Sequence, residues 1–388
     1  MNSLLIRNVR IVLQNSIFDG EVLIEDGIIA GVYAPGKDPE AGREIIDGGG
    51  GYLAPGFIDI HNHGRLGVNV MDSADALRKV AEGQLAHGVT GFLAGTSTIP
   101  WDKALAAIRV IADYCRADCC RDGVPDRSRC LGIYSEGTFF SQEKRGAQHP
   151  AWLFPPSGER VDALLEAGGD GLKVVALSPE LPGALDAVPR LRRRGIVAAA
   201  AHSNADYDQA MAGINAGIGL STHTFNGMRS LHHQDPGILG AVLNDDRVVC
   251  EIIADGIHIS PAVLSIIYKL KGPAGIALVS DSVELNGLPD GEYRAGERLV
   301  TLRQGAIRLA DGRLAGSCLS LDRAVRNMTV MAGVPLWDAA AMASLVPARV
   351  LGLEAKKGSV ETGKDADLVL LDENLAVRNV FIGGKPCF

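Results

Sequence analysis

The chain has 388 residues, of which 47% are hydrophobic and 22% are charged, a composition typical of a folded globular protein and not of a disordered chain. The formal net charge of −8 argues against nucleic acid as a partner, because nucleic-acid-binding proteins present basic surfaces. The sequence has no signal-peptide pattern and no apolar stretch of membrane-spanning length, and its seven cysteines, an odd number, fit a reducing compartment. We therefore expect a cytoplasmic protein that binds neither nucleic acid nor membranes.

Residues 1–53 predict the first part of a small β domain. The dipeptide Asp26-Gly27 is a hairpin signal, because both residues tolerate the positive φ of a tight turn. Residues 354–388 return to the same short-strand pattern, so we expect the two chain ends to complete a single β-sandwich. Four apolar runs in the first part are typical of short strands: Leu4–Ile6, Ile11–Leu13, Glu21–Ile24 and Ile28–Val32.

Residues 54–353 predict a second, larger domain in which strands alternate with helices. Eight alternations favour a (β/α)8 barrel over a doubly wound open sheet. Residues 284–316 interrupt this domain with a predicted hairpin, a candidate loop over a substrate. The expected strands are 54–63, 89–98, 130–136, 171–178, 196–202, 218–225, 248–255 and 276–281. The expected helices include 74–86, 101–114, 182–194, 205–216 and 261–271, and Pro189 should kink or shorten the third of these.

Residues that bind metals or transfer protons stand at the ends of several predicted strands. The first strand ends at His61 and His63, and a spacing of two places both imidazoles on one side of an extended chain. Barrel active sites form at the carboxyl ends of the strands. The two histidines and the residues at four other strand ends therefore predict together a centre for one or two divalent ions. Four other strands end at residues of the same kind: Glu136, His202, His223 and Asp281.

Glu136 is the candidate for a carboxylate that bridges two ions, because it follows a strand between the two pairs of histidines. Each residue also has a structural alternative, as a core histidine, a salt-bridged acid or a helix cap. For all of these alternatives to hold, several costly buried polar groups would have to gather at one end of the barrel by chance.

Seven segments carry a resemblance to a known family. They are Pro55–Gly64, Ala201–Ala205, Thr222–Met228, Ala254–His258, Leu278–Asp281, Leu314–Ser317 and the tail Gly358–Val369. The sequence resembles the amidohydrolase superfamily and, within it, the N-acetylglucosamine-6-phosphate deacetylases, nearly from end to end.

The resemblance implies roles for individual residues. Glu136, His202 and His223 would bind the metal found throughout the family, and His61 and His63 would help to bind a second ion. Zn²⁺ is the first expectation and Fe²⁺ the alternative. Asp281 would be both a metal ligand and the acid–base residue, and His258 would contact the acetyl carbonyl. The implied substrate-binding residues are Ala147, Gln148, Asn226, Gly227, Arg229, Gln234, His258, Leu314 and Ala315.

Gln234 departs from the family pattern at a position that matters for the substrate. Relatives carry an arginine there, which reaches the phosphate of the substrate in the neighbouring subunit of a homodimer. A neutral glutamine lacks the charged, bidentate grip that suits phosphate. Either Arg229, Arg145 or Lys144 replaces that grip, or the substrate has no 6-phosphate.

The expected activity is removal of the acetyl group from an N-acetylated amino sugar, first of all N-acetylglucosamine 6-phosphate or its galactosamine epimer. Metal-activated hydroxide would attack the amide, and Asp281 would pass the proton to the leaving amine. A deacetylase of non-phosphorylated sugars and an amidohydrolase acting on N-acyl amino acids or cyclic amides stay open. Amidohydrolases with a carboxylated lysine need that residue at the end of the fourth strand, whereas Lys173 lies near its start. A non-catalytic barrel is disfavoured, since all ligands are present.

Overall fold

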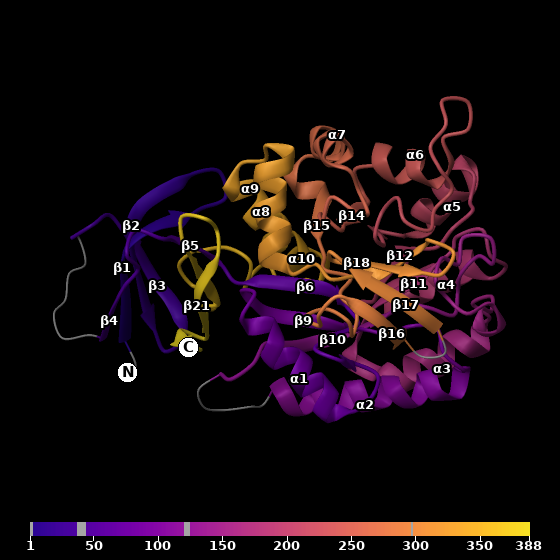
Figure 1. Cartoon of the computed structure of the whole chain (residues 1–388), viewed down its shortest axis with the longest axis horizontal. Helices are drawn as coiled ribbons and strands as arrows, with labels where there is room; N and C mark the ends of the chain where they lie inside the picture. Colours follow the sequence, from indigo (N-terminus) through magenta and orange to yellow (C-terminus); the bar gives the residue numbers. More distant parts are fainter. Residues whose placement is uncertain (1–2, 37–43, 120–124, 296–297) are drawn as a thin grey trace.

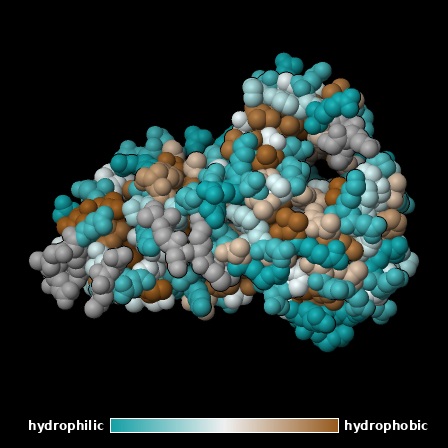
Figure 2. All heavy atoms as spheres, turned by 90° about the horizontal axis from the view of Figure 1, so that it is seen from below, coloured by the Kyte–Doolittle hydropathy of each residue, from teal (hydrophilic) through white to brown (hydrophobic). Residues whose placement is uncertain are grey.

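The computed structural model describes residues 3–36, 44–119, 125–295 and 298–388. Two lobes are visible in Figure 1, a β domain at one end and a larger lobe in which helices surround a barrel. The N and C termini both lie in the β domain, as the similar patterns of the two chain ends predicted. On the face in Figure 2, hydrophilic and hydrophobic residues are intermixed. Among the described residues, no helix combines the length and the hydropathy that a membrane crossing requires.

The β domain is one eight-stranded sheet built from both ends of the chain. The strands run in the order β22-β21-β20-β5-β1-β2-β3, and β4 pairs with β1. β5 joins the two ends, because it pairs with β1 on one side and with β20 on the other. The strands are β1 (Ser3–Val12), β2 (Ile17–Glu25), β3 (Ile28–Tyr33), β4 (Glu44–Asp47), β5 (Tyr52–Pro55), β20 (Leu368–Leu371), β21 (Val377–Ile382) and β22 (Lys385–Pro386).

The sheet folds over a core that both chain ends share, including Ile6, Ile24 and Phe381. Its β3 edge also meets the C-terminal segment, where Ile29 N donates to Lys364 O at 2.8 Å. The predicted turn at Asp26-Gly27 is confirmed, with φ values of 47° and 84°. The predicted runs 4–6 and 11–13 form the single strand β1, in which a bulge after Ile6 absorbs the change of pattern.

The barrel has eight parallel strands in the order β15-β14-β13-β12-β11-β10-β9-β6, which confirms the predicted fold class. Helices cover the outer faces and side chains fill the interior, which is why these strands appear in the sequence as nearly continuous apolar runs. The strands are β6 (Phe57–Asn62), β9 (Val89–Gly95), β10 (Arg129–Ser135), β11 (Leu172–Leu177), β12 (Val197–Ala200), β13 (Leu220–Ser221), β14 (Val249–Ile252) and β15 (Ile276–Leu278).

Hydrogen bonds beyond the last strand close the barrel. Asp281 N donates to His61 O at 2.9 Å, His63 N donates to Ser282 O at 2.8 Å, and Asn62 and Ser282 form a parallel bridge. The closure therefore places Asp281 beside both histidines of the first strand.

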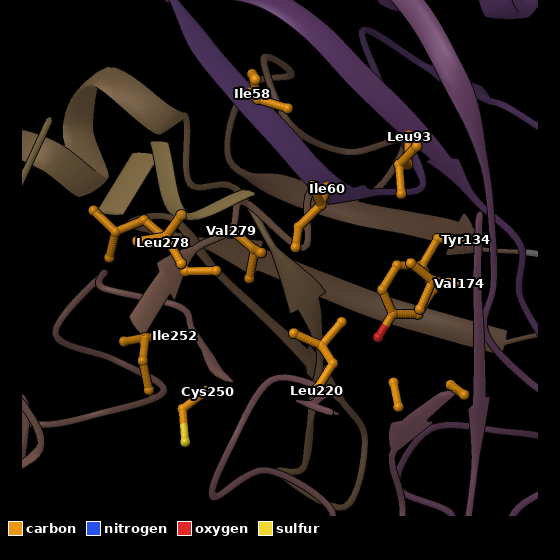
Figure 3. Close-up of a cluster of buried hydrophobic side chains, with 14 of the residues drawn as sticks. Ile58, Ile60, Leu93, Tyr134, Val174, Leu220, Cys250, Ile252, Leu278 and Val279 are labelled. Carbon is orange, nitrogen blue, oxygen red and sulfur yellow. The ribbon is translucent and has the colours of Figure 1, made fainter. Parts of the chain in front are cut away.

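Buried apolar side chains from the barrel strands hold the lobe together (Figure 3). Each fully buried large side chain, such as Phe57 or Phe92, contributes roughly 1.5–3 kcal/mol by leaving water. The labelled side chains come from most of the strands and from the residue after β15: Ile58, Ile60, Leu93, Tyr134, Val174, Leu220, Cys250, Ile252, Leu278 and Val279.

The helix α4 is continuous through Pro189, so the predicted shortening at this residue is wrong. Proline removes one backbone hydrogen bond, but Ala187, Val188 and Leu191 bury the apolar face of the helix and hold it in place. The helices are α1 (Ala74–Leu85), α2 (Trp101–Cys119), α3 (Gly158–Gly168), α4 (Ala184–Arg193), α5 (Tyr207–Ala216), α6 (Gly237–Asn244), α7 (Pro261–Lys271), α8 (Leu321–Ala332), α9 (Leu336–Ala343) and α10 (Leu345–Val350). Short 3₁₀ turns occur at Pro150–Trp152, Gly169–Gly171 and Pro273–Gly275.

The interruption after β15 is a four-stranded antiparallel sheet, which contains the predicted hairpin. It has a small core of its own around Val300 and Ile307. Ser317 N donates to Asp281 O at 3.0 Å, so the inserted sheet is attached directly to the end of the eighth barrel strand. Its strands are β16 (Gly291–Ala295), β17 (Arg298–Arg303), β18 (Ala306–Leu309) and β19 (Leu314–Ser317), and a separate small hairpin follows β6 as β7 (Gly64–Arg65) and β8 (Val68–Asn69).

Candidate active site

The six predicted ligands meet at the carboxyl ends of the barrel strands. His61 belongs to β6 and His63 follows it, while Glu136 follows β10. All six are buried, with relative exposures between 0% and 8%. Their ligand atoms form two groups, His61, His63 and Asp281 in one and Glu136, His202 and His223 in the other, and within each group these atoms lie within 4.8 Å of one another.

In the first group, the Nε2 atoms of His61 and His63 lie 3.0 Å apart. Asp281 Oδ1 is 3.2 Å from His63 Nε2 and 3.8 Å from His61 Nε2. The strand geometry brings the two rings together as expected, and the barrel closure supplies the carboxylate. Three ligand atoms therefore converge on one point.

In the second group, Glu136 Oε1 lies 3.2 Å from the Nε2 atoms of both His202 and His223, which are 3.1 Å from each other. The other oxygen, Glu136 Oε2, lies 3.6 Å from His63 Nε2 in the first group. One carboxylate thus faces both groups, the position that a bridging ligand needs.

The hydrogen bonds of the ring nitrogens show that cations fit both groups. Three Nδ1 atoms donate to oxygens that can only accept: His61 to Glu251 Oε2 at 2.9 Å, His63 to Gly95 O at 2.9 Å and His202 to Lys144 O at 2.8 Å. In its neutral form, each of these rings therefore directs an Nε2 lone pair into the centre. Lone pairs and carboxylate oxygens that face one another at about 3 Å repel, and a divalent cation between them removes the repulsion.

The charges in the centre act strongly on its pKa values. Burial lowers the pKa of His63, but its hydrogen bond to Asp281 and the charges of Glu136 and Asp281 outweigh burial and raise that pKa to about 9. Burial raises the pKa of Asp281, but the hydrogen bond from His63 and the charges of His61 and His63 lower it to about 2. The pKa of Glu136 is also lowered, because hydrogen bonds from His202 and His223 outweigh burial. Both carboxylates are therefore ionised at neutral pH.

Three of the candidate ligands have backbone conformations that L-residues rarely adopt. The φ angles of His202, His223 and Asp281 are 44°, 28° and 46°. Such conformations cost roughly 1–3 kcal/mol each and are typical of functional sites, where the surrounding structure enforces them. For Asp281, the backbone hydrogen bonds to His61 and Ser317 do this. Nothing in the sequence indicated these conformations.

A cavity of about 1010 Å³ opens above the two groups, between the strand ends and the inserted sheet. His63, Glu136, His202, His223 and Asp281 line it. It also brings together seven of the predicted substrate-binding residues: Ala147, Gln148, Asn226, Gly227, His258, Leu314 and Ala315.

Arg229 and Gln234 do not line the cavity of this chain. The guanidinium of Arg229 forms an ion pair with Asp235 at 2.5 Å, and Gln234 is exposed in the adjoining turn. The cations that do line the cavity are Lys144, Arg145, Arg294 and Arg313.

Polar contacts orient two of the cavity residues. His258 Nδ1 lies 2.6 Å from Asp255 Oδ2, which fixes the ring. The pKa of Asp255 is lowered, because its hydrogen bond with His258 outweighs burial. Gln148 Nε2 donates to Glu136 Oε2 at 3.2 Å, and its Oε1 accepts from Thr98 N at 3.2 Å. Gln148 is therefore hydrogen-bonded to Glu136 and also lines the cavity.

Sequence reasoning missed Glu251, a buried carboxylate in β14 that contacts His61. A signal was present, because Glu251 is the only charged residue in the apolar run 248–254. A charged side chain in a strand covered on both faces needs a partner, and the predicted histidines at the neighbouring strand ends were candidates for it.

The chain is similar to proteins of known function. The amidohydrolase family model matches residues 52–387. The chain is 38% identical to N-acetylgalactosamine-6-phosphate deacetylase of Escherichia coli O157:H7, over 95% of this chain and 94% of the relative. It is 36% identical to N-acetylglucosamine-6-phosphate deacetylase of Vibrio furnissii, over 94% and 89% of the two chains.

Solved structures agree with these relationships. N-acetylglucosamine-6-phosphate deacetylase from Pasteurella multocida matches with a TM-score of 0.92 and 26% identity, over 99% of each chain. A point mutant of the deacetylase from Mycobacterium smegmatis, in complex with N-acetyl-D-glucosamine-6-phosphate, matches with a TM-score of 0.90 and 30% identity, over 99% of this chain and 98% of the other. The chain therefore belongs to the amidohydrolase family and, within it, to the N-acetylglucosamine-6-phosphate deacetylases.

Proposed function

We propose that this protein is a metal-dependent hydrolase that removes the acetyl group from an N-acetylhexosamine 6-phosphate. The observation that carries the proposal is the position of Glu136, which belongs to one three-residue ligand group and lies 3.6 Å from His63 of the other, at the base of one cavity. The names of the related proteins support an amide of a phosphorylated amino sugar as the substrate.

The chemistry needs an activated water and a group that moves its proton. A divalent ion held by these residues supplies water that is reactive at neutral pH. Asp281 is ionised and lines the cavity, so it accepts the proton of the attacking water and returns it to the amine nitrogen as the C–N bond breaks. Acetate and the amino sugar leave. His258, held by Asp255, is placed to contact the acetyl carbonyl.

Zn²⁺ is the proposed metal and Fe²⁺ the alternative. Imidazole nitrogens and carboxylate oxygens suit both ions. Each of the two ligand groups would hold one ion, and Glu136, which faces both groups, would be a ligand available to either ion. Metal analysis of protein purified without chelators measures both identity and number.

Lys144 and Arg145 are the proposed partners of the substrate phosphate. Both line the cavity, whereas Arg229 is already paired with Asp235. They lie on the segment whose backbone also contacts His202, so a phosphate held there would fix the sugar relative to the metal ligands. This arrangement offers the charge that Gln234 lacks.

A deacetylase of non-phosphorylated N-acetylhexosamines is the second candidate, and Gln234 is the observation that favours it. Acetate release from N-acetylglucosamine and N-acetylgalactosamine, each with and without the 6-phosphate, separates the two candidates. A kcat/KM at least 100-fold higher for a phosphorylated sugar supports the first. Equal values for both forms of the same sugar would support the second.

We also propose that the enzyme acts in the cytoplasm as a homodimer. The described cysteines Cys115, Cys130, Cys250 and Cys318 are free thiols, which fits a reducing compartment. The dimer is an expectation from the family resemblance. Light scattering coupled to gel filtration measures it directly, and a monomer at the concentration of the activity assay would contradict it.

A further inference from the structure

We propose that Glu251 is a positioning residue that sets the affinity of the His61–His63–Asp281 group for its metal ion. The inference rests on the proposed metal-dependent function and goes beyond it, because it assigns a role to a residue that touches neither ion nor substrate. Glu251 would act through His61, by holding the ring in one tautomer and one orientation.

The burial of Glu251 requires such an explanation. Its exposure is 0%, and it lies in the apolar strand β14. Burying a carboxylate is strongly unfavourable unless it has a hydrogen-bonding or charged partner. Its Oε2 atom lies 2.9 Å from His61 Nδ1 and accepts from His223 N at 3.1 Å, while Oε1 has no hydrogen-bond partner among the described residues. The hydrogen bond from His61 Nδ1 therefore supplies the side-chain partner that this buried carboxylate needs.

The contact acts on the metal-facing side of the ring. With Nδ1 donating to Glu251, the lone pair of His61 is on Nε2, which faces His63 Nε2 and Asp281 Oδ1. A carboxylate behind a ligating imidazole fixes its tautomer and raises its basicity, and losing such a partner typically weakens metal binding about 10- to 100-fold.

The effect should be specific to the first ligand group. His63 and His202 donate Nδ1 to backbone carbonyls, and His223 Nδ1 has no partner among the described residues. Of the four histidines, His61 is thus the one whose Nδ1 is held by a carboxylate. Glu251 contacts the second group only through the backbone N–H of His223.

Two substitutions separate the charge of Glu251 from its geometry. In Glu251→Gln, the amide oxygen can take the place of Oε2, and the amide nitrogen that of Oε1, which accepts no hydrogen bond from the described residues. This variant keeps the oxygen that accepts from His61 Nδ1 but loses the negative charge. Glu251→Ala loses both. Cys250→Ala is the matched control, because it truncates the preceding fully buried residue of β14, whose thiol donates to Val242 O.

The experiment measures Zn²⁺ affinity and stoichiometry of the full-length protein by competition with chelators of graded strength. We expect two ions per chain in the wild type and in Cys250→Ala. In Glu251→Ala, the affinity for one ion falls about 10- to 100-fold and the other affinity changes less than about threefold. The affinity of Glu251→Gln for that ion lies between the affinities of the wild type and of Glu251→Ala. In a His61→Ala background, Glu251→Ala has no further effect on affinity, because Glu251 acts through that ring.

Three results would overturn the proposal: unchanged affinities in Glu251→Ala, an equal loss at both ions, or a loss in Cys250→Ala as large as in Glu251→Ala. Acetate release by the wild-type enzyme is measured in parallel. If the wild type deacetylates amino sugars and Glu251→Ala binds both ions normally, the role of Glu251 fails and the proposed function stands. If the wild type binds two ions but deacetylates none of the sugars, the proposed function fails and the affinities still decide the role of Glu251.

Discussion

Replacing Asp281 with asparagine separates proton transfer from metal binding. Asparagine keeps an oxygen at the position that lies 3.2 Å from His63 Nε2, but it cannot accept a proton at neutral pH. The loss of a placed general base costs about 10²–10⁴ in rate. At about 1.36 kcal/mol per factor of ten, this corresponds to about 3–5 kcal/mol of added barrier.

The same substitution should leave the metal in place. The hydrogen bond and the charge of Asp281 help to raise the pKa of His63 to about 9 in the metal-free protein, so a proton competes with the ion at neutral pH. Without the carboxylate, the pKa of His63 falls, and the lower proton competition offsets part of the lost attraction between Asp281 and the ion.

The assay compares acetate release and metal content in Asp281→Asn and wild type, purified identically. Asp113→Asn, at an exposed ion pair on α2, is the control and should behave as the wild type. A variant that keeps its metal and loses at least about 99% of kcat agrees with the assigned role. Loss of the metal, or retention of more than a tenth of kcat, would refute it.

Three further predictions concern the phosphate, the protons and one glycine. Joint replacement of Lys144 and Arg145 by alanine should raise KM for the 6-phosphate about 10- to 100-fold and leave KM for the unphosphorylated sugar unchanged, because both cations line the cavity. Equal changes of KM for both sugars in steady-state assays would contradict this. Because the pKa of His63 is about 9 in the metal-free protein, metal uptake should release a proton, and the apparent affinity for the metal should fall as the pH falls from about 9 to about 6. Calorimetry in two buffers measures the released proton, and a metal affinity independent of pH would exclude competition between the proton and the ion at His63. Gly227→Ala should lower metal content and activity, because Gly227 has a φ of 62° and a Cβ there would lie 2.6 Å from His202 Nδ1. Full metal content in elemental analysis would show that the His202 ring can move aside.

The sequence located the barrel well because its strands are covered on both faces. Such strands are continuous apolar runs, and all eight appear in the structure with the expected parallel arrangement. Pro189 does not end the helix α4, so the shortening predicted there does not occur, and the reason is tertiary. The buried side of α4 stabilises the helix by more than one missing hydrogen bond costs.

The β domain shows a second difference of this kind. Apolar patterning indicated two short strands before residue 14, where the structure has the single strand β1. The polar residues between the two runs sit at a bulge, with Asn8 at a φ of 55°. β5 extends to Pro55, past the expected boundary at residue 53, because Ala54 and Pro55 pair with β20 from the other end of the chain. Pairing partners this distant leave no mark on local sequence patterns.

By itself, the sequence determined which side chains could form the metal centre, because the two-residue spacing of His61 and His63 and the ends of apolar runs are local properties. Only the tertiary structure decided which of them come together in each ligand group, that Glu136 faces both groups, and that Glu251 contacts His61 Nδ1. These relations depend on distances between strand ends that lie far apart in the chain, such as His61 and Asp281, and only barrel closure fixes those distances.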